Sequence, residues 1–269
     1  MRGDTSRRLT QAPSPSPSPS PSPSPVSRVD FGRGRGLGLV HGVNRSEQRH
    51  EAGPPRHALV WLRPGERGSV RAHDPAHGAE VARWLALGLP AVARRRDAAT
   101  AADEVALAIA LPSARGRARV ALVAPALAIA RVAPPLRLAE ARASAPPEWA
   151  ADLAALDGEA RRAGVVLRAY GSLAWQHLTG EVYLRDGSDV DLLAPGTTED
   201  ERARSLGVLR RWAAHARPRL DGELDLGGGR GVAWRELLAP GPRVLVKTSA
   251  SVALVPLAQA LGPSAGGAP

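Results

Sequence analysis

The chain has 269 residues, with 36 Lys and Arg against 26 Asp and Glu, seven His and no Cys. The absence of Cys excludes a disulfide framework, a Cys-ligated metal centre and a thiol nucleophile, and it favours a reducing cytoplasm as the compartment. The longest apolar runs, such as Val120 to Ala130, are too short to span a membrane, so no membrane association is expected.

The first 55 residues form a low-complexity segment. Residues Ser14 to Pro25 are six consecutive Ser-Pro dipeptides, which favour an extended conformation with nothing to pack. This segment contributes +4 of the formal net charge of +10. We expect residues 1–55 to be a disordered tail, so only a modest positive excess remains for the folded part.

The region from residue 56 to 146 alternates between strand-like and helix-like stretches. The patterns predict strands over 57–62, 89–94, 104–111 and 119–123 and a helix over 79–87, with 126–133 ambiguous. Proline pairs at 134–135 and 146–147 place a domain boundary near residue 146. We therefore expect an N-terminal α/β domain over 56–146 and a second domain over 147–269.

The second domain opens with a predicted amphipathic helix over 147–163, a β-rich run over 165–170 and a helix over 172–178. Gly171 and Ser172 lie between the last two, with Ser172 as the expected N-cap. The unpaired N–H groups at a helix N-terminus favour an anion, so Gly171 and Ser172 are candidate phosphate-binding residues.

A predicted buried strand over 188–193 carries Asp189 and Asp191 two positions apart. Residues i and i+2 of a strand point to the same face, about 6 to 7 Å apart. Mg²⁺ prefers one or two carboxylates together with substrate phosphates. Alternatively, both acids lie on the solvent-exposed face of an edge strand. The motif alone does not distinguish between these two interpretations.

After a predicted helix over 199–215, the run 219–226 alternates acids with other residues, at Asp221, Glu223 and Asp225. If this strand lies beside the Asp189 strand, Asp221 or Glu223 can complete a three-carboxylate cage for two divalent ions. Lys247, the only lysine, follows an apolar strand over 243–246. It is a candidate ligand for a leaving diphosphate, or else a strand-end lysine that reaches solvent.

The order of these elements resembles the nucleotidyltransferase fold of the polymerase-β superfamily, an α+β fold here preceded by a smaller α/β region. Within it, residues 169–195 read AYGSLAWQHLTGEVYLRDGSDVDLLAP. This stretch resembles the malonate decarboxylase holo-acyl-carrier-protein synthase family, the phosphoribosyl-dephospho-CoA transferases. Similarity extends to residues 56–65, 220–238 and 244–248, and so covers roughly residues 56–256.

The resemblance implies transfer of the 2′-(5″-triphosphoribosyl)-3′-dephospho-CoA group to a serine of the apo acyl carrier subunit of malonate decarboxylase, with release of diphosphate. It implies Mg²⁺ or Mn²⁺ as cofactor, held by Asp189 and Asp191, and a phosphate turn at Gly171 and Ser172. The third carboxylate stays open between Asp221, Glu223 and Asp225, with Asp221 preferred as a catalytic residue.

Two other functions compete with this one. Another nucleotidyltransferase, which moves a nucleotide to a small molecule, a protein or RNA, would share the metal site. A non-catalytic, basic nucleic-acid-binding protein would fit the positive charge. The chain has only two Tyr and one Phe, which offer few platforms for base stacking, so nucleic acid is disfavoured as a partner.

Overall fold

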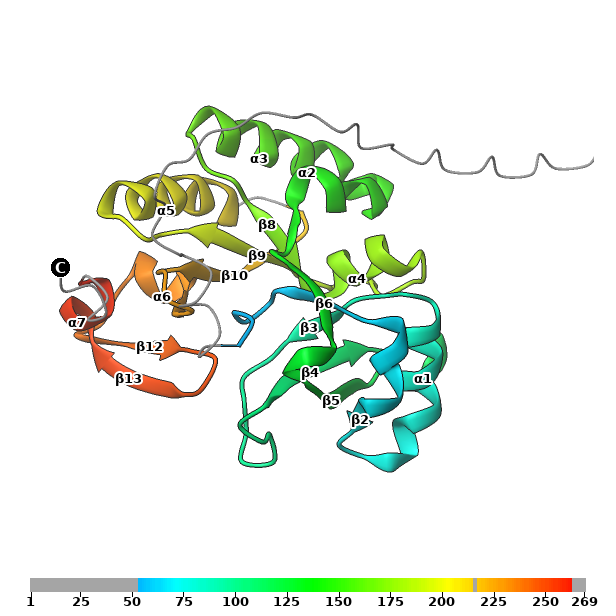
Figure 1. The fold of residues 1–269 in the computed structure, drawn as a ribbon. Helices are drawn as coiled ribbons and strands as arrows, with labels where there is room; N and C mark the ends of the chain where they lie inside the picture. The colour runs from blue at the N-terminus through cyan, green and yellow to red at the C-terminus, as the bar shows by residue number, and fades with distance from the viewer. Residues whose placement is uncertain (1–52, 215–216, 263–269) are drawn as a thin grey trace, which may run out of the picture. The chain divides into compact units, whose positions relative to one another are not determined.

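The computed structural model describes residues 53–214 and 217–262, and the chain there is a mixed α/β protein with two β-sheets (Figure 1). The predicted tail, residues 1–55, lies outside the described residues up to position 52. Within the described residues, no helix is both long enough and apolar enough to cross a lipid bilayer.

The first sheet has six strands, all antiparallel, in the order β2-β5-β4-β3-β1-β6. The strands are β1 (Leu59–Leu62), β2 (Arg71–Ala72), β3 (Ala91–Ala93), β4 (Glu104–Ala110), β5 (Arg119–Pro125) and β6 (Ile129–Ala133). Helix α1 (Gly78–Ala86) lies between β2 and β3 in the chain. The predicted strands and helix of this region are therefore present, and the ambiguous stretch 126–133 is mostly strand.

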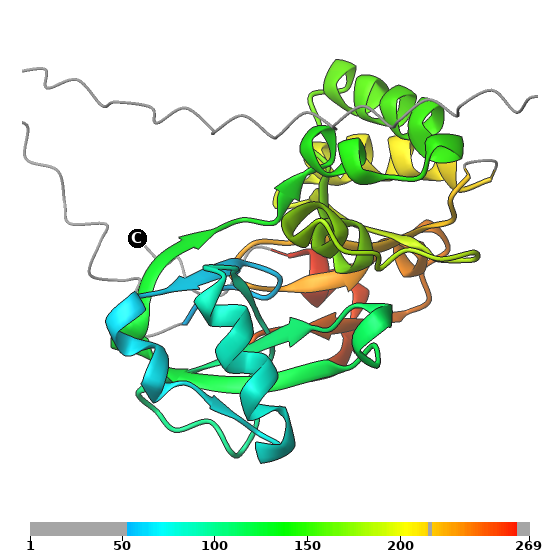
Figure 2. The ribbon, with the colours of Figure 1, turned by 90° about the vertical axis from the view of Figure 1, so that its right-hand side faces the viewer.

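The two faces of this sheet have different neighbours. Alternate residues of the central strands, such as Leu107 and Leu122, are buried in a core with Val81 and Trp84 of α1. Figure 2 shows α1 lying against this sheet. The intervening residues, such as Ala108, point to the opposite face, which is free to form one wall of a cavity.

The second sheet has seven strands in the order β13-β12-β11-β10-β9-β8-β7. Its strands are β7 (Leu136–Arg137), β8 (Arg168–Tyr170), β9 (Val190–Pro195), β10 (Leu220–Asp225), β11 (Gly231–Ala233), β12 (Arg243–Lys247) and β13 (Val252–Pro256). Strands β9 and β10 are parallel and the other pairs are antiparallel. The parallel pair brings the two acidic runs of the sequence side by side.

Six helices accompany this sheet: α2 (Leu138–Ala141), α3 (Ala150–Arg162), α4 (Gly171–Thr179), α5 (Glu199–Ala213), α6 (Trp234–Leu238) and α7 (Leu257–Leu261). Val190 and Leu192 of β9 share a core with Leu153 of α3 and Val208 of α5, so these helices cover one face of the sheet (Figure 1). By strand alternation, the acids of β9 and β10 lie on the opposite face.

Two details of the second region differ from the sequence expectations. Helix α4 begins at Gly171 with Tyr170 as its N-cap, so Ser172 lies in the first turn and is not the cap. Strand β7 pairs with β8, so the chain joins the second sheet at Leu136, ten residues before the boundary predicted near 146. The proline pair at 134–135, and not the one at 146–147, precedes this change of sheet.

Candidate active site

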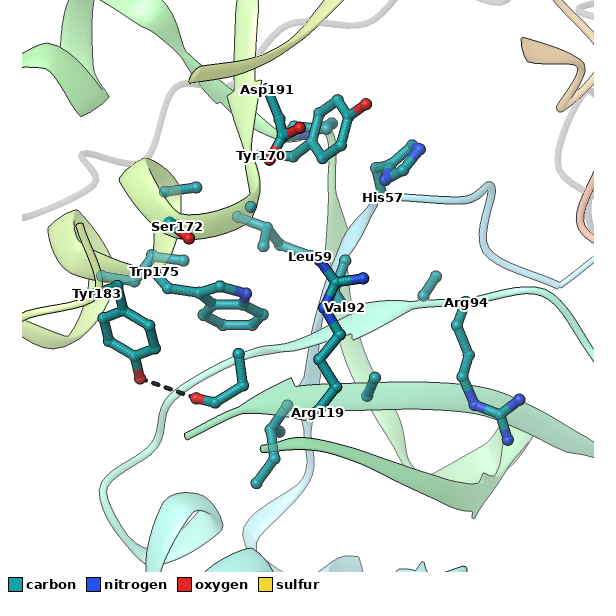
Figure 3. Close-up of a pocket in the computed structure, with 18 of the residues that line it drawn as sticks. His57, Leu59, Val92, Arg94, Arg119, Tyr170, Ser172, Trp175, Tyr183 and Asp191 are labelled. Carbon is teal, nitrogen blue, oxygen red and sulfur yellow. Dashed lines mark hydrogen bonds between the residues drawn. The ribbon is translucent and has the colours of Figure 1, made fainter. Parts of the chain in front are cut away.

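A cavity of about 610 Å³ is lined by residues of both sheets. The first sheet contributes Leu59, Val92 and Arg119, and the second contributes Tyr170 and Asp191 (Figure 3). Gly171, Ser172 and Lys247, three of the predicted site residues, also line this cavity. Since a ligand pocket of a few hundred cubic ångströms is typical of small-molecule sites, the cavity is the candidate active site.

Gly171 and Asp191 fit together at one wall of the cavity. Gly171 has a φ of +67°, which side-chain-bearing residues rarely adopt, and a Cβ atom there would lie 2.1 Å from Oδ2 of Asp191. Only glycine leaves room for this carboxylate. The Asp191 side chain therefore rests against the first turn of α4, where Ser172 also faces the cavity.

Asp191 and Asp221 form the carboxylate pair that the alternating pattern predicts. They are register partners on β9 and β10, and Tyr170 is the partner of Asp191 on β8. Burial raises the pKa of Asp191 to about 6, and the negative charge of Asp221 adds to this rise. A buried acid next to a second acid is destabilised in its ionised form, so this pair attracts a cation.

Asp189 is placed differently from the expectation. Strand β9 begins at Val190, so Asp189 precedes the strand and is not within it. Its carboxylate accepts two hydrogen bonds from the guanidinium of Arg219, one of them 2.6 Å long from Nε. The structure therefore pairs Asp189 with an exposed arginine, while its negative charge still acts on the carboxyl of Asp191.

Glu223 is the centre of a buried ion cluster. Its Oε1 atom lies 2.9 Å from Nη2 of Arg56 and 2.9 Å from Nζ of Lys247, and Oε2 lies 3.0 Å from Nη1 of Arg56. Burial alone would raise the pKa of Glu223, but hydrogen bonds from His57, Arg56 and Lys247 hold it well below its usual range. The carboxylate of Glu223 thus binds cationic side chains of the protein itself.

Gly231 allows this cluster to form, because a Cβ atom there would lie 2.6 Å from Oε2 of Glu223. The cluster also connects distant parts of the chain, since Arg56 and Glu223 are 167 positions apart. Asp225, the last candidate for the third carboxylate, accepts a hydrogen bond of 2.9 Å from the backbone N–H of Gly227. Of the three candidates, only Asp221 lies opposite Asp191.

Arg56, His57 and Tyr170 are site residues that the sequence did not indicate. The rings of His57 and Tyr170 stack with their centroids 4.0 Å apart. Burial raises the pKa of Tyr170, and the charges of Glu223 and Asp191 raise it further. The only signal for them in the sequence is the position of Tyr170 directly before Gly171.

Across the two described ranges, no group of three or more His, Cys, Asp or Glu side chains is gathered closely enough to hold a metal ion. The expected three-carboxylate cage is therefore not assembled here. The donors that are gathered are Asp191 and Asp221, and two carboxylates completed by substrate phosphates are a suitable set for one Mg²⁺ ion.

The raised pKa of Asp191 has a consequence for stability. Because the folded state disfavours the ionised form, the contribution of Asp191 to stability falls as pH rises from about 4 to about 6. Asp191→Asn removes this penalty, so with a chelator present we expect the variant to be more stable than the wild type at pH 7.5 by up to about 3 kcal/mol. Urea unfolding between pH 4.5 and 7.5 measures this difference, which should shrink as pH falls below 6. A difference that does not change with pH would contradict the assignment.

Comparisons with known proteins divide the chain between residues 135 and 136, where it passes from the first sheet to the second. The model of the N-terminal domain of phosphoribosyl-dephospho-CoA transferase MdcG matches residues 55–135, and the model of its C-terminal domain matches residues 136–258. A phosphoribosyl-dephospho-CoA transferase of Xanthomonas campestris pv. campestris (strain 8004) is 40% identical over 201 residues, which are 75% of this chain and 93% of the relative. The chain belongs to the phosphoribosyl-dephospho-CoA transferase family. The family predicted from residues 169–195 is thus confirmed.

Relatives from other organisms carry the same name. The phosphoribosyl-dephospho-CoA transferase of Bradyrhizobium diazoefficiens is 40% identical over 210 residues, covering 77% of this chain and 92% of the relative. That of Azotobacter vinelandii is 31% identical over 207 residues, covering 75% and 92%. No solved structure matches the chain. Membership of a transferase family favours an enzyme over the non-catalytic nucleic-acid-binding alternative.

Proposed function

We propose that the protein transfers the 2′-(5″-triphosphoribosyl)-3′-dephospho-CoA group to a serine of the apo acyl carrier subunit of malonate decarboxylase, in a reducing cytoplasm. The names of the relatives support the phosphoribosyl-dephospho-CoA substrate. The observation that carries the proposal is the contact of the Asp191 carboxylate with Gly171, at a cavity lined by cations. Asp191, whose register partner is Asp221, thus lies beside a helix N-terminus and positively charged side chains at one cavity.

The chain order supports a polymerase-β-like nucleotidyltransferase fold for the second region. Strand β8 leads through Gly171 and Ser172 into α4, β9 carries Asp191, and α5 leads to β10 with Asp221. This is the strand, Gly-Ser turn, helix and acidic-strand order of that superfamily. The proposal assigns the carboxylate pair to its metal-binding position.

Asp191 and Asp221 are the residues that would hold Mg²⁺ or Mn²⁺, and Asp189 would join them only after release from Arg219. The donor chemistry fits, because both acids are half-buried and Asp191 has a raised pKa that a cation would relieve. When bound, the ion would supply positive charge to the phosphate oxygens at the reacting centre.

In the reaction, Oγ of the carrier's serine attacks the α-phosphorus of the substrate, and the bond from that phosphorus to the oxygen bridging to the β-phosphate breaks. Diphosphate leaves with the electron pair of that bond. Asp221 accepts the proton of the serine hydroxyl, and its Oδ2 is available because Oδ1 accepts the N–H of Gly222 at 2.8 Å. The N–H groups and hydroxyl of the first turn of α4 position the phosphates.

Lys247 can be both a ligand for the leaving diphosphate and a partly exposed strand-end lysine, the two interpretations that the sequence allows. Its ammonium is bound to Glu223 but also lines the cavity, and an ammonium has three donors. Lys247 can therefore donate to the leaving diphosphate while Glu223 holds it in place. Its partial burial, with 32% of the side chain exposed, keeps it at the cavity wall.

A comparison of binding affinities distinguishes this substrate from the nucleotide of another nucleotidyltransferase. The triphosphoribosyl precursor and ATP are each titrated into the full chain with Mg²⁺ by isothermal titration calorimetry. We expect the precursor to bind at least about 100-fold more tightly, since only it carries the complete dephospho-CoA group. Equal affinities, or tighter binding of ATP, would favour the other nucleotidyltransferase.

A further inference from the structure

Three of the six cationic side chains that line the cavity are already bound by the protein. Arg56 and Lys247 both bind Glu223. Arg94 donates to Oδ2 of Asp97 at 2.7 Å, and Figure 3 shows its guanidinium turned away from Tyr170 and Asp191. These three side chains have their charges largely satisfied before any substrate arrives.

The other three are Arg95, Arg117 and Arg119, and all are exposed. Among the described residues, none of their guanidinium groups has a hydrogen bond or an ion pair. Arg119 differs from the other two in where it points: in Figure 3 its side chain extends across the cavity toward Tyr170 and Asp191. Its positive charge is also close enough to act on the carboxyl of Asp191.

The neighbours of Arg119 on the sheet leave it unpaired. Ala110 of β4 is its register partner, Ala121 is the next residue of β5 on the same face, and Ala108 is the partner of Ala121. All three alanines line the cavity. Methyl side chains offer no acceptor and occupy little space, so the guanidinium stands free above a small apolar floor.

We propose that Arg119 binds the triphosphate arm of the substrate from the first sheet, opposite Ser172 on the second. This inference rests on the proposed function for the identity of the substrate. A guanidinium has a fork of donors that matches two phosphate oxygens, and charge-assisted hydrogen bonds of this kind are strong. Arg119 thus positions the phosphates between the two sheets, so both regions of the chain build the substrate site.

The test measures binding of inorganic triphosphate to the full chain by calorimetry, with Mg²⁺ present and at constant ionic strength. Arg119→Gln is expected to weaken this binding by about 10- to 100-fold, because it removes a charge-assisted bidentate contact. Arg119→Lys should recover part of the affinity, since it restores the charge without the fork. Unchanged triphosphate affinity in Arg119→Gln would overturn the proposal.

Arg131→Gln is the matched control. Arg131 is an exposed arginine on β6 of the same sheet, but it stacks over Trp61 at 3.5 Å and does not line the cavity. Its substitution should change triphosphate affinity by less than about twofold, whereas an equal loss in both variants would mean non-specific attraction and would also overturn the proposal.

Binding of triphosphate needs no carrier protein, so this test is independent of the transfer reaction. If the wild type fails to modify the carrier but loses triphosphate affinity through Arg119→Gln, the proposed function fails and the anion site stands. If the carrier is modified and Arg119→Gln binds triphosphate normally, the function stands and the role of Arg119 is wrong.

Discussion

Asp191→Asn is expected to lower kcat for transfer by about 1,000-fold, a loss of about 4 kcal/mol of transition-state stabilisation. The substitution keeps the shape of a side chain that rests on Gly171 but removes the charge that attracts a cation. Asp221→Asn should cause a similar loss, because Asp221 is the register partner and the proposed proton acceptor. Continuous measurement of diphosphate release with saturating Mg²⁺ gives both rates.

Asp225→Asn is the matched control, since Asp225 belongs to the same alternating run but binds the backbone of Gly227. We expect it to keep its activity within about threefold of the wild type, because surface acids away from the reacting centre contribute little. Full activity in Asp191→Asn, or equal losses in the Asp221 and Asp225 variants, would contradict the assignment. A higher stability of Asp191→Asn without metal, as expected above, would show that its loss of activity is not due to unfolding.

Glu223→Gln is expected to destabilise the protein by about 3 kcal/mol, because it leaves Arg56, His57 and Lys247 around a neutral amide. Only 5% of the Glu223 side chain is exposed, so water cannot replace the lost charge. The corresponding fall in Tm is about 6 to 12 °C for a chain of this length. Thermal unfolding monitored by circular dichroism measures this change.

Asp200→Asn provides the comparison, since Asp200 and Arg204 form an exposed ion pair on α5. Loss of this ion pair should lower the free energy of unfolding by less than about 1 kcal/mol.

Glu223 can be a metal ligand or the centre of the buried ion cluster, and titration with Mn²⁺, followed by electron paramagnetic resonance, separates these two roles. A Glu223→Gln variant of normal Tm that no longer binds Mn²⁺ would make Glu223 a metal ligand, as one interpretation of the sequence allowed.

The local features of the site could be predicted from the sequence. The β-rich run before Gly171 and the acids alternating along 219–226 each fix an element and a face by short-range pattern. The acids of the two acidic runs meet because β9 and β10 are neighbouring strands, with Asp191 opposite Asp221. The family resemblance was carried by these same residues.

The partners of these acids could not be predicted, because they come from distant parts of the chain. The alternating pattern makes Glu223 a candidate metal ligand, but Arg56, 167 positions away, binds its carboxylate. Strand periodicity also left Arg119 without a role, since alternation does not say which face of a sheet borders a cavity. Asp189 lies outside β9 because the strand begins at Val190, two residues after the predicted start at 188, and a strand end is the part of a pattern that is hardest to predict.

Short elements near the C-terminus were missed for a related reason. Strand β11 has only three residues and follows a glycine-rich turn that joins it to β10. Strand β13 is bounded by Ser251 and by a proline that ends it, and most of its side chains are exposed, so no alternation marks it. Both strands depend on tertiary pairing with β10 and β12 rather than on local propensity.

The intact mass of the apo acyl carrier subunit of malonate decarboxylase, after incubation with the full chain, Mg²⁺ and the triphosphoribosyl precursor, tests the proposed activity most directly. We predict that the carrier gains the mass of the phosphoribosyl-dephospho-CoA group on one serine, and that Asp191→Asn gives no gain in the same time. An unmodified carrier with the wild-type protein, or equal modification by wild type and Asp191→Asn, would contradict the assigned reaction and its site.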